Sequence, residues 1–485
     1  MAKSFIKNKP AINMTIVGFG NAGSRMADEF AAFSSPDGSM LYNCLALNSN
    51  DGDLQALKNI PESSRVSLNL GGLGKNPLKA IEILKENEDA NEKLKSFIHD
   101  KVRPTDDLVL FFAGLGGGTG TATIVKAITE FYEYNNKPLI KEELMKIQQS
   151  VGQDDFLNNR QKYIKQAFKA AESRFTKIGV IVTLPLRTDG PDVLYQVNEF
   201  SQEIWKTAKD ASKGIAFVIF GDNQVFKDEF DKMPANERGK IDNYRDYGNK
   251  QISEIFHELN TATTGGGTSV LLDSQDFRRA IMEQRGSLVL SKVEAPMDQS
   301  TNADDITNLF KKSFKNSNLH QPIDVTEKLE DGSIVAKKVH HVGLLAILDE
   351  KKDLGNGGFL EDAQTHVHEI LPVNGTVFSG FLKEKNDFKA SIYTFYKVDG
   401  LPARLEQGLV NEYNEFMEKN KKRVYKDTTL QSIQRDDDDD FDLDLDLADF
   451  GMAPSTSDKN NSKKELETVP SLDDLLDNIN FSDED

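Results

Sequence analysis

The sequence predicts an α/β protein built around a doubly wound parallel sheet, and two observations lead to this fold class. Short apolar runs, as expected for strands buried on both faces of a parallel sheet, alternate with helix-like stretches. Two glycine-rich loops also stand where a predicted strand passes into a predicted helix. Because such sheets bind ligands at the carboxyl ends of their strands, the loops after the strands are the expected functional site.

The first half of the chain supplies the predicted sheet. Its strands are expected at residues 14–17, 42–47, 66–70, 108–112, 178–183 and 215–220. A helix is predicted over 24–33 and a longer one over 243–261, because their apolar residues recur with helical spacing. Residues 137–177 are polar and rich in helix formers, as expected for an insertion between two strands.

The second half has a different pattern. Strand-like runs at 287–290, 342–348 and 391–396 surround polar segments, which indicates a smaller α+β domain. A charged helix is predicted over 401–423. The chain then becomes acidic and low in complexity, a composition that is typical of disorder.

The charge of the protein is unevenly distributed. The 485 residues contain 59 Lys and Arg against 78 Asp and Glu, a net charge of −19. Residues 436–485 hold 18 of the acidic and 3 of the basic side chains, a net of −15, so the first 435 residues carry only −4. Coating nucleic acid requires a basic surface. We therefore expect no direct binding of nucleic acid.

The cysteine content and the apolar runs bear on the cellular compartment. A single cysteine, Cys44, excludes a disulfide scaffold and a cysteine-based metal site, and fits a reducing cytoplasm. The start of the sequence lacks the apolar stretch of a signal peptide. Residues 108–125 are uncharged, but five glycines interrupt them, which favours a strand and a turn over a membrane span. We expect a cytoplasmic protein without a membrane segment.

The first glycine-rich loop joins the strand at 14–17 to the helix at 24–33 and has the sequence GFGNAG, residues 18–23. Glycine lets the backbone approach a phosphate, and a helix N-terminus supplies amide donors. Alone, the loop is compatible with the dinucleotide site of an NAD-dependent oxidoreductase, or with a tight turn. A dinucleotide site has an acidic residue at the end of the second strand, where this sequence has Asn48 and Asn50.

The second glycine-rich loop follows the strand at 108–112 and has the sequence AGLGGGTGT, residues 113–121. Two such loops at neighbouring strand ends predict a phosphate chain that backbone N–H groups hold from both sides. The GxxxxGK[ST] pattern of a P-loop does not occur in the sequence.

The run GGGTGT at residues 116–121 resembles the GGGTG[ST]G signature of the tubulin/FtsZ family, with Ala122 in place of the last glycine. The segments at 48–50, 72–77, 183–190 and 221–223 are similar, in chain order, to further nucleotide loops of that family. The resemblance implies GTP or GDP and Mg²⁺ as cofactors. The nucleotide-binding residues that it implies are Gly18, Gly20, Asn21, Ala22, Gly23, Asn48, Asn50, Gly74, Asn76, Gly114, Gly116, Gly117, Gly118, Thr119, Gly120, Thr121, Pro185, Asp189, Asn223, Tyr244 and Asn249.

Among these residues, the resemblance assigns guanine recognition to Asn223 and Asn249. An asparagine amide suits guanine because it offers both a donor and an acceptor. Tyr244 is the candidate for stacking on the base, with Tyr247 as the alternative. For an isolated asparagine, a turn or a helix cap is the competing interpretation.

The segment 265–277 resembles the loop that carries the catalytic carboxylates of the family. Asp273 and Asp276 match its acidic positions by their three-residue spacing, while Leu271 replaces the usual asparagine. In this role a carboxylate positions the attacking water at the nucleotide of the next subunit. The competing interpretation is that Asp273 is a helix N-cap and Asp276 a solvated side chain.

The resemblance therefore implies a GTPase whose hydrolysis is completed by the adjacent subunit, and which polymerises head-to-tail into dynamic cytomotive filaments. The NSN sequence at 48–50 and the GLP sequence at 400–402 resemble the TubZ branch of the family, which is plasmid- or phage-encoded. That branch segregates DNA through a DNA-bound adaptor of the TubR type, which binds the C-terminal tail. The alternatives are a phage tubulin that positions DNA or capsids, a division-ring FtsZ and, more remotely, an NAD-dependent oxidoreductase.

The same resemblance divides the chain into six parts. They are an N-terminal extension, a GTP-binding domain with the insertion at 137–177, a central helix, an activation domain with the catalytic loop, a C-terminal helix and a disordered acidic tail. The expected bounds are 1–11, 12–242, 243–265, 266–400, 401–425 and 426–485.

Overall fold

The computed structural model describes residues 9–422, except 36, 75, 104, 265–267, 269, 315–316, 330, 353 and 356. Its centre is a ten-stranded sheet in the order β11-β10-β12-β7-β6-β5-β4-β1-β2-β3. These strands are β1 (Met14–Phe19), β2 (Asn43–Asn48), β3 (Arg65–Ser67), β4 (Leu108–Gly114), β5 (Lys177–Leu184), β6 (Ile215–Asp222), β7 (Ser287–Pro296), β10 (Val339–Asp349), β11 (Val377–Glu384) and β12 (Lys389–Val398). A separate pair joins β8 (Thr326–Lys328) to β9 (Ile334–Ala336).

The predicted α/β class with a mostly parallel sheet is confirmed. All strands from β3 through β2, β1, β4 and β5 to β6 pair in parallel, so their carboxyl ends lie along one edge. The third strand is shorter than the predicted 66–70. Leu68 and Leu70 still donate to the carbonyls of Asn48 and Ser49, at 2.9 and 2.8 Å, but Asn69 has a left-handed backbone that ends the ladder.

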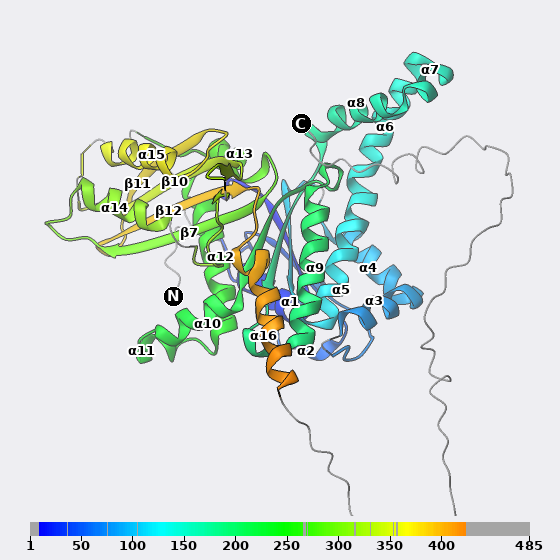
Figure 1. Cartoon of the computed structure of the whole chain (residues 1–485), viewed down its shortest axis with the longest axis horizontal. Coiled ribbons are helices and arrows are strands. Elements are labelled where there is room, and N and C mark those ends of the chain that lie inside the picture. Colours follow the sequence, from blue (N-terminus) through cyan, green and yellow to red (C-terminus); the bar gives the residue numbers. More distant parts are fainter. Residues whose placement is uncertain are drawn as a thin grey trace, which may run out of the picture.

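The helices lie on both faces of this sheet (Figure 1). The longer ones are α1 (Gly20–Ala31), α3 (Pro77–Glu86), α4 (Glu88–Lys101), α5 (Gly118–Phe131), α6 (Lys137–Val151), α8 (Arg160–Ala171), α9 (Pro191–Lys209), α10 (Asn223–Lys232), α12 (Tyr244–Ala262), α13 (Ser274–Met282), α14 (Ala303–Ser313), α15 (Gly358–Ile370) and α16 (Leu409–Lys421). The short ones are α2 (Asp51–Gln55), α7 (Gln153–Asn158) and α11 (Ala235–Arg238).

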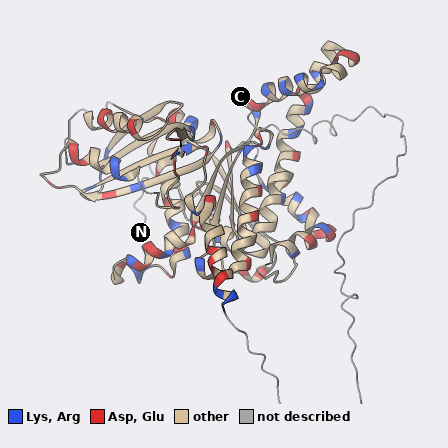
Figure 2. Ribbon diagram, viewed as in Figure 1, with Lys and Arg blue, Asp and Glu red and all other residues tan. Residues whose placement is uncertain are grey.

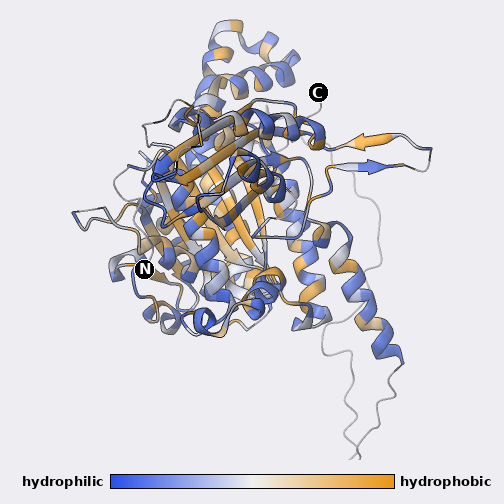
Figure 3. Ribbon diagram, turned by 90° about the vertical axis from the view of Figure 1, so that its left-hand side faces the viewer, coloured by the Kyte–Doolittle hydropathy of each residue, from blue (hydrophilic) through white to orange (hydrophobic). Residues whose placement is uncertain are grey.

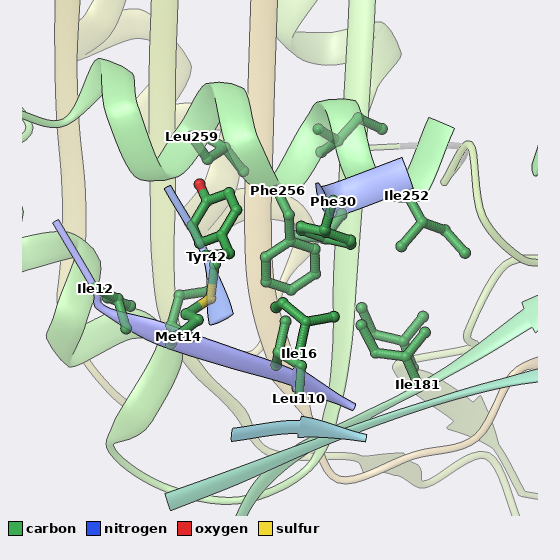
Figure 4. Close-up of a cluster of buried hydrophobic side chains, with 14 of the residues drawn as sticks. Ile12, Met14, Ile16, Phe30, Tyr42, Leu110, Ile181, Ile252, Phe256 and Leu259 are labelled. Carbon is green, nitrogen blue, oxygen red and sulfur yellow. The ribbon is translucent and has the colours of Figure 1, made fainter. Parts of the chain in front are cut away.

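Alternation of side chains along the strands builds two cores. Ile16 of β1 packs in a cluster with Phe30 of α1 and Ile252 of α12, which Figure 4 shows. The next residue, Val17, packs in the cluster to which α5 and α9 contribute. The strands are apolar on both faces, which is why they read as continuous hydrophobic runs. Figure 3 shows them as the most hydrophobic part of the molecule.

The second half of the chain continues the same sheet. Val218 of β6 pairs in parallel with Ser287 of β7, and β12 then pairs antiparallel with both β7 and β10. A third core forms where α14 and α15 cover these strands. The α+β region that the sequence predicts is therefore joined to the first half through the backbone of β6 and β7.

The predicted insertion corresponds to α6, α7 and α8, which project away from the sheet in Figure 1. These helices contribute most of one hydrophobic cluster, in which Leu144, Phe156 and Ile164 are buried and which Tyr132 and Ala211 of neighbouring segments join.

The C-terminal helix begins later than the predicted residue 401. Arg404–Gly408 form a π-helical turn, and α16 follows from Leu409. Pro402 cannot donate a backbone hydrogen bond, which places it ahead of the helix. Leu405 and Leu409 pack into the core that α9 shares, and the rings of Tyr195 and Tyr413 lie 6.1 Å apart.

Charged side chains of both signs are mixed over the helices, while the strands carry few of them (Figure 2). Across the described ranges, no helix combines the length and the apolar character needed to cross a membrane. The acidic tail predicted at 426–485 and residues 1–8 of the predicted extension lie outside the described residues.

Candidate nucleotide-binding site

A cavity of about 470 Å³ opens at the carboxyl ends of β1, β2, β4, β5 and β6. Five of the 21 residues predicted to bind the nucleotide do not line it, so sixteen do. The sixteen lining residues are Gly20, Asn21, Ala22, Asn48, Asn50, Gly74, Gly114, Gly116, Gly117, Gly118, Thr119, Gly120, Pro185, Asp189, Asn223 and Asn249.

One end of the cavity is formed by the N-termini of two long helices, α1 and α5. Their N-cap positions are Phe19 and Gly117, and neither helix has a side-chain cap or an acidic residue in its first turn. Uncapped N–H groups and the positive end of the helix dipole favour an anion. The residues present therefore fit a phosphate chain at this end.

Glycines allow the loops at this end to pack closely together. A Cβ at Gly20, where φ is +66°, would lie 2.7 Å from the nitrogen of Gly120. A Cβ at Gly118 would lie 2.6 Å from the carbonyl oxygen of Gly74, to which the Gly118 N–H donates at 3.0 Å. A side chain at either position would separate loops that surround the cavity.

Polar contacts connect the loop after β2, which holds Asn48, Ser49 and Asn50, to the first turn of α5. The Thr119 hydroxyl donates to the Ser49 hydroxyl at 2.9 Å, and the Asn48 amide donates to the Asp53 carboxylate at 2.9 Å. The Asn50 side chain caps α2 by accepting from the Asp53 N–H at 3.2 Å. The loop after β2 therefore has a fixed position beside the first turn of α5.

The cavity wall also includes Asn223, Asn249, Pro185 and Asp189. Asn223 begins α10 directly after β6, and Asn249 lies in the second turn of α12. Asp189 accepts the Leu186 N–H at 2.9 Å, which closes the loop after β5. Two amides in the cavity wall suit an aromatic base that offers both donors and acceptors.

The five predicted residues outside the cavity wall have structural roles. Gly18 and Gly23 provide the close approach of β1, α1 and β4, since a Cβ at Gly23 would lie 2.1 Å from the Phe112 oxygen. Asn76 caps α3, and Thr121 donates to the Gly114 carbonyl at 3.4 Å.

Tyr244, the fifth of them, does not line the cavity. It is the first residue of α12, and the guanidinium of its neighbour Arg245 lies over its ring at 4.9 Å from the ring centre. Arg245 lines the cavity instead. The structure thus brings an arginine, and not the predicted tyrosine, to this part of the wall.

Several lining residues were not predicted from the sequence, and the charged ones among them are Arg25, Asp53 and Arg245. Arg25 pairs with Asp246 of α12 at 3.4 Å, which links α1 to α12 at the cavity. Its position could have been deduced, because Arg25 follows Asn21 by four residues and shares its helix face.

The predicted catalytic carboxylates lie elsewhere. Asp273 is the N-cap of α13 and accepts from the N–H groups of Gln275 and Asp276, at 2.8 and 2.9 Å. The capping interpretation is thus correct for Asp273, although one of its oxygens is enough for that role. Burial, followed by the charge of Asp273, raises the pKa of Asp276.

The contacts of α13 place these carboxylates at the amino ends of the strands. Arg278 of α13 pairs with Asp107 at 2.6 Å and donates to the Ala11 carbonyl at 3.0 Å. Asp107 and Ala11 precede β4 and β1. The cavity lies at the opposite, carboxyl edge of the same strands, so one subunit cannot bring Asp273 or Asp276 to its own cavity.

Helix α12 connects the two edges. Arg245 and Asn249 near its start line the cavity, while Asn260 near its end binds the Ile12 N–H at 2.7 Å ahead of β1. A helix of 19 residues is about 28 Å long. The cavity and the carboxylates are thus separated by the height of the sheet.

Comparisons with known proteins agree with this geometry, although no protein-family model matches the chain. The tubulin-like protein TubZ of Bacillus thuringiensis subsp. israelensis is 23% identical over 288 residues, which are 56% of this chain and 52% of the relative. The tubulin-like protein CetZ of Thermococcus kodakarensis is 33% identical over 128 residues, 24% of this chain and 30% of that protein. The chain thus spans about half the length of the TubZ relative and less of the CetZ relative.

Solved structures show the same fold. A GTPγS-form protofilament of TubZ from Bacillus thuringiensis serovar israelensis matches with a TM-score of 0.61 and 19% identity, over 87% of this chain and 93% of that one. The GDP-bound monomer of CetZ1 from Haloferax volcanii matches with a TM-score of 0.54 and 17% identity, over 84% and 100%. The chain therefore has the fold of these tubulin-like proteins. In sequence it is similar to TubZ over about half of its length.

Proposed function

We propose that the protein binds GTP and GDP in the cavity at the carboxyl edge of the sheet. The observation that carries this proposal is the presence, in the wall of one cavity, of two helix N-termini without a side-chain cap and of two asparagine amides. The first pair suits phosphates and the second suits guanine. The nucleotide forms named for the matched TubZ and CetZ1 structures support the same ligand.

We further propose that GTP hydrolysis requires a second subunit. Asp273 and Asp276 lie at the opposite edge from the cavity, so only a neighbour stacked head-to-tail can present them to the bound nucleotide. Either carboxylate would orient the attacking water, and the amides of α1 and α5 would stabilise charge on the phosphates. Mg²⁺, for which Asp53 in the cavity wall is a suitable oxygen ligand, would neutralise phosphate charge when bound.

Head-to-tail stacking of this kind is a heterologous contact, which generates a filament when it does not close into a ring. Several of the matched TubZ structures are described as protofilaments or as filaments of two or four strands. We therefore propose that GTP favours polymerisation of this protein and that hydrolysis weakens the contact between subunits.

The cellular role that we propose is segregation of plasmid or phage DNA through a DNA-bound adaptor of the TubR type that binds the acidic tail. One matched structure is described as a type III plasmid segregation TubZ. Deletion of residues 436–485 should spare GTP turnover and abolish binding of the adaptor. A small basic DNA-binding protein encoded alongside would support this role, whereas neighbouring phage structural genes would favour a phage tubulin.

The nucleotide released on denaturation of the purified protein tests the proposed binding of GTP and GDP. GDP or GTP is expected, and NAD would instead support the oxidoreductase alternative. Sedimentation tests the proposed polymerisation: polymer should pellet with GTP and not with GDP. Failure to pellet at any protein concentration would contradict the filament.

A further inference from the structure

A buried arginine connects the C-terminal helix to the part of the cavity wall formed by Pro185 and Asn223. Arg404 lies in the π-helical turn ahead of α16, and its side chain is 1% exposed. Its guanidinium donates to the Glu412 carboxylate on α16 through two nitrogens, at 3.1 and 2.9 Å. A bidentate contact of this kind fixes the orientation of both side chains.

The remaining donors of Arg404 reach the sheet. Its Nη1 donates to the Pro185 carbonyl at 2.7 Å and to the Asp222 carboxylate at 2.6 Å. Pro185 follows β5, and Asp222 is the last residue of the neighbouring strand β6. One guanidinium thus contacts the carboxyl ends of two adjacent strands and the helix that closes the described chain.

Both strand ends contribute directly to the cavity. Pro185 lines the cavity, and so does Asn223, which follows Asp222. Asp222 also caps α10, because the oxygen that binds Arg404 accepts the Gln224 N–H at 2.9 Å. The position of Asn223 therefore depends on the Asp222 carboxylate, to which Arg404 donates.

The network is poorly suited to tolerate loss of the arginine. Asp222 is 1% exposed, and its second oxygen has no hydrogen-bond partner among the described residues. Burial already raises the pKa of Asp222, and Arg404 opposes that shift. Without the guanidinium, Asp222 would face the Glu412 charge in a buried site, which favours protonation or movement of the Asp222 side chain.

We propose that Arg404 is a positioning residue that sets Asn223 and Pro185 for recognition of the base, so that the choice of nucleotide depends on how α16 is seated. This inference rests on the proposed binding of GDP and GTP. It also implies coupling in both directions, because a partner that moves α16 must change nucleotide affinity by the same factor as the nucleotide changes affinity for that partner.

The test compares the dissociation constants of GDP and ADP, titrated into nucleotide-free full-length protein. In Arg404→Met the ratio of the ADP constant to the GDP constant should fall by about ten-fold or more through weaker GDP binding, with ADP binding unchanged, because a misplaced amide loses guanine-specific contacts. Arg404→Lys should recover part of the ratio. If Arg404 had only a structural role, Arg404→Met would weaken the binding of both nucleotides equally or of neither. Either result would overturn the inference.

Lys337→Met is the matched control. Lys337 pairs with Glu406 in the same π-helical turn but reaches neither strand end, so its loss should leave the ratio unchanged. If Arg404→Met does not fold, Glu412→Gln decides, since it weakens the contacts of α16 with Arg404 and with Arg187 of the loop after β5, while Arg404 keeps Pro185 and Asp222. A reduced ratio supports the inference and an unchanged ratio contradicts it. A wild-type protein that does not prefer GDP contradicts the proposed function itself.

Discussion

Asp273 and Asp276 are three residues apart but have different environments. Asp273 uses one oxygen to cap α13, whereas Asp276 is partly buried beside it. A substitution at Asp273 therefore combines two effects, loss of a helix cap and loss of a charge. Asparagine separates them, because it caps a helix as well as aspartate does.

We expect Asp276→Asn and Asp273→Asn to bind GDP with unchanged affinity and to hydrolyse GTP on the order of 10²-fold more slowly, leaving persistent filaments. Phosphate release measured above the polymerisation threshold checks the rate. Asp273→Ala, which also removes the cap, should in addition lose about 1 kcal/mol of stability. Unchanged turnover in both asparagine variants would show that neither carboxylate acts on the nucleotide.

His257 is a titratable group in the core of the sheet. It stacks on Phe33 with ring centres 3.9 Å apart, and its Nδ1 lies 3.0 Å from the Tyr42 hydroxyl. Burial lowers its pKa to about 4 from the usual 6.5. Between these two pH values the unfolded chain binds a proton at His257 that the folded protein does not, so stability is lost as the pH falls through this range.

His257→Gln should reduce that loss, which amounts to about 3 kcal/mol between pH 6.5 and pH 4 for a shift of this size. The measurement is the free energy of unfolding by urea at several pH values, with and without the substitution. His368→Gln serves as the control, because His368 is exposed on α15 and should leave the slope unchanged. An equal slope in the wild type and His257→Gln would contradict this origin of acid sensitivity.

Helices and strands were predictable to different degrees. The apolar runs located β1, β4, β5 and β6 because strands buried on both faces need apolar residues at every position. The end of β3 and the start of α16 were misplaced, since each depends on a local backbone feature, the left-handed Asn69 and the π-helical turn at Arg404–Gly408. Pairing of β6 with β7 joins residues far apart in sequence, which no local pattern encodes.

The candidate site shows the same division. Its glycine loops were visible in the sequence because a close approach of backbones excludes other residues. Arg245 was missed because it reaches the cavity only when α1 and α12 are placed side by side, whereas the position of Arg25 follows from the helix face that it shares with Asn21. The separation of Asp276 from the cavity was implied by the family resemblance, and the direction in which α12 crosses the sheet agrees with it.

The insertion formed by α6 to α8 should behave as a separately stabilised element. Phe156→Ala should cost about 3–5 kcal/mol locally, because Phe156 is buried against Tyr163 in a cluster remote from the cavity. Hydrogen exchange should then show lost protection in α7 and α8, with GDP affinity unchanged. Leu157→Ala, at the exposed neighbouring position, should leave protection intact. Weaker GDP binding in Phe156→Ala would show that the insertion supports the cavity.

The whole molecule combines a cavity at one edge of a continuous sheet with carboxylates at the other. This arrangement makes a mixing experiment possible. Asp276→Asn keeps its cavity, while Gly118→Ala keeps its carboxylates but brings a Cβ within 2.6 Å of the Gly74 oxygen. Each variant alone should hydrolyse GTP slowly, the first because it lacks the carboxylate and the second because it binds nucleotide poorly.

Mixed in equal amounts, the two variants should recover a measurable part of wild-type turnover, since a cavity of the first then meets the carboxylates of the second. Phosphate release from the mixture, compared with the sum of the separate rates, gives the result. A mixture of Asp276→Asn with Asp273→Asn is the control for general effects of protein concentration. Additive rates in the first mixture would exclude catalysis between subunits.

The position of α13 has a consequence for the ends of such a filament. At the end of the proposed filament where a cavity faces solvent, no neighbour would supply Asp273 and Asp276, so the terminal subunit would keep its triphosphate however old the polymer becomes. The interior subunits would convert theirs with time. The tip with the exposed cavity would therefore always hold a triphosphate, which marks the direction of the filament. A partner sensitive to the nucleotide state could then distinguish the two tips of a polymer made of identical chains.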